Sequence, residues 1–422
     1  MARPVTCGPS CAKLKLALDI AEPMDAPSSD WQHRPVDSSS LGTKFLVYPQ
    51  APFVPGYEQP EVIWISTPAG RVKAGPADHR MYVADPMLDK PPYHRPFLPP
   101  WTGDLHAPAE PGPDGHFDHL SPHMRPFMSA HAFACVRRVL DVSESYLGRE
   151  TPWFFLPTYE RLEIVPHLRW TNAQSGFGFL ELGEDDSRDT PFPYALNFDV
   201  IAHETGHLIL FGALGAPDRR DPSFEYLAYH EFAADFISLL SLLHFDSVLD
   251  RMLRRTKGDL LLSNELDRVA ELFDERAIRS ASHSLKMSDV GRELHDYSRP
   301  FTGAVFDSLI EIFHLLLLER GMRTLDTRSI RSVREDMSQD EIERTLRDSV
   351  QNYRVHHFAV KAALEEARDI VGDALVRSWE GLDPDSLTFP EAASAIVDRA
   401  EEGRGRRFAD RIYENFIWRE IL

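Results

Sequence analysis

The sequence has few cysteines and lacks any long uninterrupted hydrophobic run. Its three cysteines, Cys7, Cys11 and Cys135, cannot all pair with one another, which excludes a disulfide framework. We expect reduced thiols, with a Cys7–Cys11 pair or metal site as the alternative. The most apolar helical segments, 236–245 and 308–318, are short and interrupted, so we expect no membrane-spanning helix.

The N-terminus also lacks the continuous apolar stretch of a signal peptide, and we therefore expect a cytoplasmic protein. Acidic residues outnumber basic ones, 66 to 46, which gives a formal net charge of −20. Such a chain is a poor partner for nucleic acid or an anionic membrane surface, and a neutral or cationic substrate fits it better. Its 422 residues are too many for one simple core, which predicts two lobes and leaves the oligomeric state open.

Proline separates two regions of the chain. Most of the 32 prolines precede Met128, and proline disfavours helix, so the early region is expected to form strands, turns and extended loops. A turn is expected at Gly70, and the segment 86–126 is expected to be irregular but ordered. Alternating and β-rich stretches predict strands at 44–50, 61–67, 80–86 and 161–170.

The later region reads as helical. Apolar residues recur at three- and four-residue spacing in segments 127–147, 263–278, 303–320, 339–379 and 389–422, with room for a break in the fourth. We therefore predict an α+β protein with an N-terminal extension at 1–43, a β-rich lobe at 44–196 and an all-helical lobe at 197–422. A helix near 197–213 is expected to join the two lobes.

That joining helix carries the motif His203-Glu204-Thr205-Gly206-His207. Histidines four residues apart lie on one face of a helix, one turn apart, and can bind one zinc ion together. Glu204 follows the first histidine and is placed to reach a zinc-bound water rather than the metal. Zinc lowers the pKa of such a water, and the carboxylate can take its proton as the water attacks a carbonyl.

A catalytic zinc needs a third protein ligand and an open fourth position. Glu231 stands in a second apolar helical segment, 24 residues after His207, and is a good third ligand. Asp235 lies one turn later, where its carboxylate can accept a hydrogen bond from the far nitrogen of a zinc-bound histidine. Two carboxylates on an otherwise hydrophobic helix are costly to bury without such partners, which favours the metal site over a plain surface helix.

The pattern His203-Glu204-x-x-His207 followed by Glu231-x-x-x-Asp235 resembles the thermolysin-like gluzincin zinc metallopeptidases, over roughly residues 110–422. The resemblance implies their fold, with a β-rich N-terminal lobe and a helical C-terminal lobe. Asn172-Ala173 is similar to the family's Asn-Ala edge strand, which pairs with an extended peptide substrate by strand addition. The segment 127–147 resembles the family's first long helix, and the region from 388 to the C-terminus its closing pair of helices.

The resemblance implies further site residues. His295 fits the family's histidine that hydrogen-bonds the oxyanion of the tetrahedral intermediate. Arg279, with Lys286 as the competitor, fits the arginine that holds a substrate carbonyl. Tyr226, with Tyr229 as the alternative, fits the tyrosine donor. The acidic run Glu184-Asp185-Asp186 with Asp189 leaves a calcium ion as a second possible cofactor beside zinc.

The leading hypothesis is a zinc metalloendopeptidase that acts on a restricted peptide or protein. The same two histidines and one carboxylate also suit a non-haem iron, 2-oxoglutarate-dependent oxygenase acting on peptides. Glu204 favours hydrolysis, because an oxygenase has no evident need for a water-activating base there. A non-catalytic peptide-binding protein is the third hypothesis. It is disfavoured because such a protein would not need metal ligands, a base and an oxyanion donor together.

Overall fold

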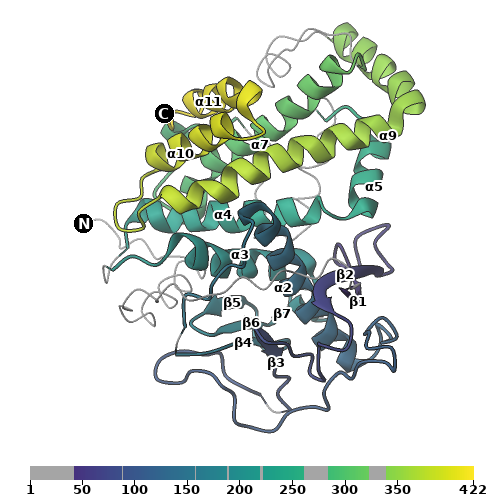
Figure 1. Cartoon of the computed structure of the whole chain (residues 1–422), viewed down its shortest axis with the longest axis vertical. Coiled ribbons are helices and arrows are strands. Elements are labelled where there is room, and N and C mark those ends of the chain that lie inside the picture. The colour runs from purple at the N-terminus through teal and green to yellow at the C-terminus, as the bar shows by residue number, and fades with distance from the viewer. Residues whose placement is uncertain are drawn as a thin grey trace. The chain divides into compact units, whose positions relative to one another are not determined.

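The computed structural model describes residues 42–87, 89–156, 158–187, 190–218, 222–260, 284–322 and 339–422. Residues 1–41 of the expected extension and the helix predicted at 263–278 lie outside these ranges. The chain divides into two compact units, Met1–Ser223 and Phe224–Leu422, which differ in secondary structure (Figure 1). The first holds all the named strands and the second is helical, which confirms a mixed α+β protein with a β-rich N-terminal region.

The first unit begins with a two-stranded antiparallel sheet of β1 (Gly42–Val47) and β2 (Glu61–Pro68). Every second residue of each strand is buried, as the alternating sequence predicted. The turn expected at Gly70 is present, and the residue has a left-handed φ of 77°. A glycine is favoured there because this conformation costs it no steric strain.

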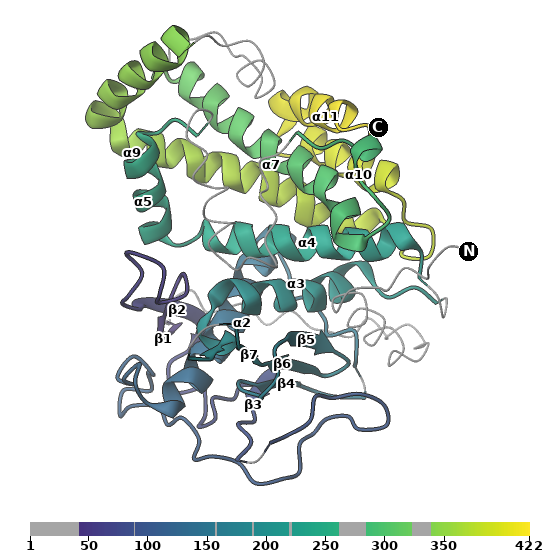
Figure 2. The same ribbon diagram turned by 180° about the vertical axis from the view of Figure 1, so that it is seen from behind.

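A second, four-stranded sheet has the order β3 (Met81–Val83), β4 (Leu162–Val165), β6 (Phe179–Leu182) and β5 (Ala173–Gly176). The first two pairings are parallel, and β5 pairs with β6 in antiparallel fashion. The strand predicted at 161–170 is shorter than expected, because Pro166 follows β4 directly and cannot donate to a sheet hydrogen bond. The strand β5 ends this order and is therefore an edge strand, as predicted (Figure 2).

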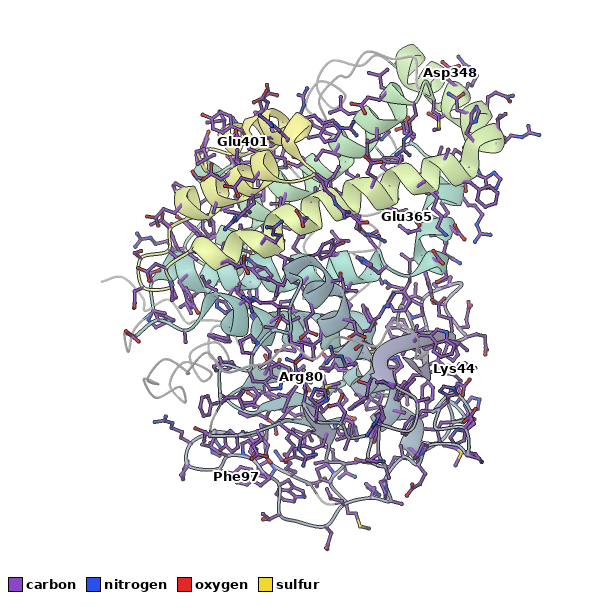
Figure 3. All side chains as sticks on the ribbon, in the orientation of Figure 1. Lys44, Arg80, Phe97, Asp348, Glu365 and Glu401 are labelled. Atoms are coloured by element: carbon purple, nitrogen blue, oxygen red, sulfur yellow. The ribbon has the colours of Figure 1, made fainter. Side chains whose placement is uncertain are left out.

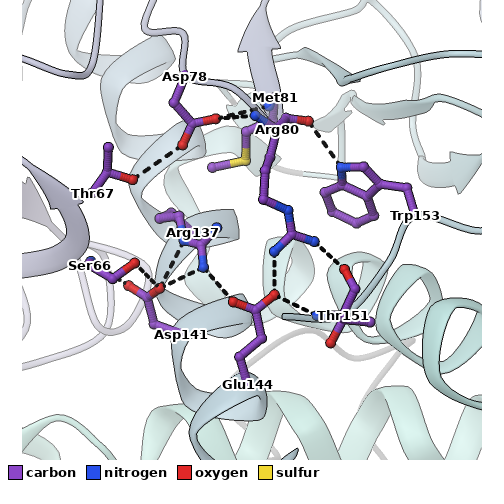
Figure 4. A network of polar contacts seen from close by, with 10 residues as sticks. All are labelled: Ser66, Thr67, Asp78, Arg80, Met81, Arg137, Asp141, Glu144, Thr151 and Trp153. Carbon is purple, nitrogen blue, oxygen red and sulfur yellow. Dashed lines mark hydrogen bonds and ion pairs between the residues drawn. The ribbon is translucent and has the colours of Figure 1, made fainter. Parts of the chain in front are cut away.

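The long helix predicted at 127–147 is α2 (Arg125–Leu147). It ends at Gly148, which adopts a left-handed φ of 70° and donates its N–H to the carbonyl of Glu144. Buried charges tie the helix to its surroundings (Figure 4). Arg137 bridges Asp141 at 2.8 Å and Glu144 at 2.6 Å, and Arg80, just before β3, pairs with Glu144 from the other side.

The segment between β3 and α2 forms no regular helix or strand among its described residues, as expected for 86–126. It is nevertheless anchored. The side chain of Lys90 is fully buried, forms an ion pair with Glu181 of β6, and lies 3.2 Å from the ring centroid of Tyr93. Phe97, labelled in Figure 3, packs on Tyr93 with ring centroids 5.1 Å apart. The proline-rich segment is thus held against the sheet by a buried cation and aromatic rings.

The motif helix is α3 (Phe198–Leu214), which contacts α2 and β5 within the first unit. Asn197 caps it, because its side chain accepts the N–H of Asp199 at 3.1 Å. At Gly212 a Cβ atom would lie 2.1 Å from the carbonyl oxygen of Pro152, so only glycine fits there. In this division α3 belongs with the β-rich unit, whereas the predicted domain boundary at 196/197 grouped it with the helical lobe.

The second unit is built from helices α4 (Phe224–Leu242), α5 (Asp246–Thr256), α7 (Leu294–Glu319), α9 (Gln339–Ser378), α10 (Phe389–Glu402) and α11 (Ala409–Trp418). The helix α7 contacts α4, α9 and α11 and forms the centre of this unit. Its Phe301 ring packs against Phe232, Phe389 and Phe416 at centroid distances of 4.5 to 5.1 Å. The break expected in the fourth helical segment is present at His356, where the backbone leaves the helical conformation.

The expectation that the apolar segment 308–318 is too short to cross a membrane was wrong, because this segment is part of the longer helix α7. This helix has 26 residues, and a window of it reaches a mean hydropathy of 1.7, which is long and apolar enough to cross a membrane. However, 89% of that window is buried inside the structure, as in the core helix of a globular protein. The helices α4 and α5 pass the test only together, and they are bent by 88°.

Candidate metal centre

The two motif histidines point their Nε2 atoms toward one another from adjacent turns of α3. These atoms are 3.2 Å apart, and the two rings are nearly perpendicular. Two nitrogen ligands at ~2.0–2.1 Å from a tetrahedral zinc ion lie roughly 3.4 Å apart. The spacing of His203 and His207 therefore fits two nitrogens that share one ion, and His207 is buried while His203 is partly exposed.

Glu204 is buried beside these histidines, and its carboxylate is held by the neighbouring strand. The hydroxyl of Ser175 on β5 donates a hydrogen bond to Glu204 Oε2 at 3.1 Å. Both side chains are almost fully enclosed, at 5% and 3% exposure. Ser175 was not among the site residues predicted from the sequence. The available signal was its place two residues after Ala173, since alternate residues of a strand share a face.

Asn172 and Ala173 lie where the edge-strand resemblance implied, at the start of β5. The side-chain Oδ1 of Asn172 accepts the N–H of Ala173 at 3.0 Å, and its backbone carbonyl accepts the N–H of Gly183 at 2.9 Å. A Cβ on Gly183 would lie 1.8 Å from the carbonyl oxygen of Trp170 and 2.4 Å from that of Asn172. The chain therefore needs glycine at this position to close the turn region around Asn172.

In the second unit, Glu231 lies on α4 with its side chain fully buried, and Asp235 follows one turn later, partly exposed. His295 comes from α7, and its Nδ1 lies 3.4 Å from Glu231 Oε2. His295 belongs to the first turn of α7, whereas the resemblance implied a place before the long helix. The structure thus brings two predicted residues together that are 64 positions apart in the sequence.

The two tyrosine candidates are both buried in α4. Trp379 donates its indole N–H to the Tyr229 hydroxyl at 3.1 Å, which makes Tyr229 part of the helical core. The Tyr226 ring packs on His230 with centroids 4.6 Å apart, and burial raises the pKa of Tyr226 well above its usual value. Both phenols therefore stay protonated at neutral pH.

Of the two basic candidates for the substrate carbonyl, Arg279 lies outside the described residues. Lys286 lies 3.7 Å from Glu420 and near the Trp418 ring, with its side chain about a third exposed. These neighbours place Lys286 against the C-terminal end of the chain.

The predicted metal ligands are side chains of the kinds that zinc binds. His203 and His207 on α3 offer two imidazoles, and Glu231 on α4 offers a buried carboxylate. Two of the acidic residues considered for calcium have other partners. Glu184 lies 3.1 Å from His167, and Asp185 accepts the hydroxyl of Ser187 at 2.6 Å. Asp189 lies outside the described residues, so a calcium site stays a prediction.

A comparison with protein-family models and with curated proteins finds no match. Among solved structures, the chain is similar to the precursor of protealysin, a metalloproteinase from Serratia proteamaculans. The two share 15% sequence identity, with 76% of this chain and 82% of that chain covered and a TM-score of 0.38. So distant a likeness says nothing of what this chain does, and the functional interpretation depends on its own site residues.

Proposed function

We propose that this protein is a zinc-dependent peptidase, with His203, His207 and Glu231 as the metal ligands and Glu204 as the general base. The observation that carries the proposal is the pair of Nε2 atoms 3.2 Å apart on α3, directly beside a buried carboxylate. Two imidazoles and one carboxylate are a ligand set that zinc hydrolases use, with the fourth position open to water or substrate. When bound, zinc supplies Lewis acidity and lowers the pKa of a water at the site.

Glu204 performs the proton transfer in this proposal. It follows the first ligand on the helix, so its carboxylate would lie close to a metal held by the two histidines without being a ligand itself. It takes a proton from the attacking water and passes it to the leaving amine. The hydrogen bond from Ser175 holds Oε2 of this carboxylate.

The edge strand β5 is the proposed platform for an extended peptide. The carbonyl of Asn172 accepts a hydrogen bond from Gly183, across the pairing of β5 with β6. Hydrogen-bonded pairs alternate along an antiparallel ladder, so the backbone groups of Ala173 and Ser175 point away from β6. The N–H of Ala173 is taken by the Asn172 side chain, so a substrate strand could pair with the carbonyl of Ala173 and the backbone groups of Ser175. Such strand addition gives affinity for peptide backbone of many sequences.

Three further residues have supporting roles in the proposal. Asp235, one turn after Glu231, would orient a ligand histidine through a hydrogen bond to its far nitrogen. His295 would donate to the oxyanion of the tetrahedral intermediate. Its distance of 3.4 Å from Glu231 also gives it a part in orienting that carboxylate. Arg279 and Tyr226 remain predicted substrate contacts.

Hydrolysis is favoured over an iron-dependent oxygenase by the placement of Glu204. A buried carboxylate beside the ligands, held by a hydroxyl, has an obvious use in activating water and none in binding 2-oxoglutarate. The two chemistries also leave different products. Hydrolysis adds one water across a peptide bond, whereas a hydroxylase leaves the chain intact and adds one oxygen atom.

The test uses the purified full chain and a mixed peptide library read by mass spectrometry. We expect new amino termini in the presence of zinc, their loss after chelation, and no products heavier by one oxygen with iron and 2-oxoglutarate. The variant His203→Ala should lose both bound zinc and cleavage, while Glu401→Gln, an exposed substitution on α10, should change neither. A protein that binds no zinc, or that oxidises peptides without cleaving them, would overturn the proposal.

A further inference from the structure

The edge strand β5 presents different chemistry on its two faces. Ser175 faces α3, where its hydroxyl donates to Glu204 at 3.1 Å. The side chain of Gln174 faces the other way and donates to Glu181 at 2.6 Å and to the carbonyl of Tyr93 at 3.2 Å. The strand is therefore fixed from the face opposite to the candidate base.

Glu181, which holds Gln174 of the strand, belongs to a fully buried ion pair. Glu181 pairs with Lys90, and neither side chain is exposed to solvent. Glu181 also accepts the backbone N–H of Tyr93 at 2.9 Å. A strand held this firmly gives its next side chain a defined position, which is what a group that orients a catalytic residue needs.

We propose that Ser175 is a positioning residue for Glu204, an inference that rests on the proposed peptidase function. The hydroxyl donates to Oε2 and so restrains the rotation of the carboxylate that would act as the base. Ser175 forms no covalent bond and gives up no proton in this role. Because the same residue lies on the proposed peptide-binding edge, one strand aligns both the substrate and the base.

The geometry gives the expected size of the effect. A hydrogen bond between a hydroxyl and a carboxylate is charge-assisted, and its loss removes one restraint on the orientation of the buried Glu204 carboxylate. We expect Ser175→Ala to lower kcat on the order of 10-fold. KM should stay within about twofold, because the substrate pairs with backbone groups that the substitution keeps.

The experiment compares wild type, Ser175→Ala, Ser175→Thr and the control Ser143→Ala, a buried serine of α2 in the same unit. Zinc content and melting temperature are measured beside kcat and KM. We expect only Ser175→Ala to lose kcat, with zinc content unchanged and with Ser175→Thr retaining most of the activity, since it keeps the hydroxyl.

Two outcomes would overturn the inference. If Ser175→Ala keeps the wild-type kcat, the hydroxyl does not position Glu204. If Ser175→Thr loses as much kcat as Ser175→Ala, the site needs a small side chain rather than a hydroxyl. In both cases the wild type still cleaves peptides, whereas a wild type without peptidase activity would contradict the proposed function itself.

Discussion

Acid should destabilise the first unit through one buried histidine. His131 lies on α2 with no exposed surface, and its Nε2 accepts the backbone N–H of Tyr48 at 3.0 Å. A proton on Nε2 would place that N–H directly opposite the backbone N–H of Tyr48, in a fully buried site. Burial accordingly lowers the pKa of His131 from 6.5 to about 4.

Proton linkage gives the direction and the size of this change in the free energy of unfolding. Below its ordinary pKa the imidazole of the unfolded chain binds a proton, while the folded protein keeps His131 neutral until the pH nears 4. The contribution of His131 is therefore fully present above pH 6.5 and is lost as the pH falls to about 4. That interval corresponds to about 3 kcal/mol, because one pKa unit is worth ~1.4 kcal/mol.

Urea unfolding at a series of pH values from 7.5 to 4 (about one half unit apart) measures this loss. Carboxylates also titrate in this range, so the wild type is compared with His131→Gln, whose amide can accept the Tyr48 N–H but does not titrate. The free energy of unfolding of the wild type, relative to that of His131→Gln, should fall by about 3 kcal/mol on acidification. The exposed substitution His79→Gln is the control. If His131→Gln loses as much stability with acid as the wild type does, the reasoning is refuted.

Three other substitutions test the packing. Lys90→Met should lower the free energy of unfolding by about 3–5 kcal/mol, because the buried Glu181 loses its opposite charge; a loss of less than ~1 kcal/mol in urea unfolding would contradict the buried ion pair. Gly212→Ala should cost about 1–3 kcal/mol through the clash with Pro152, and an unchanged melting temperature would be inconsistent with that close approach. Thr388→Ala should cost about 1 kcal/mol by removing the capping box of α10, while Thr388→Ser should restore most of it.

Elements with local signals at both ends were predictable from the sequence. The helix α2 begins near Pro126 and ends before Gly148, and Asn197 caps the start of α3, all residues typical of helix ends. The start of α7 was not predictable in this way. The helix runs through Pro300, which normally ends or kinks a helix, and nine residues of it precede Gly303, where the periodic pattern begins. Pro300 and Phe301 are both buried in the core of the second unit, and this packing offsets the lost hydrogen bond.

The same distinction applies to the candidate site, where contacts within one helix were predictable and contacts between elements were not. The spacing of His203 and His207 on one helix is local, so the sequence alone predicts that their rings meet. The contact of Ser175 with Glu204 joins a strand to a helix 29 residues away, and no local pattern encodes it. The contact of His295 with Glu231 joins two helices in the same manner, and only the resemblance to a known family pointed to that histidine.

The central claim is that Glu204 activates water beside a metal held by the two motif histidines. The most direct test is peptide cleavage by wild type and Glu204→Gln at equal, measured zinc content. We predict that the variant binds zinc as the wild type does and that its kcat falls by at least ~100-fold, the usual contribution of a general base. A Glu204→Gln variant that binds zinc and cleaves peptides at the wild-type rate would contradict the account.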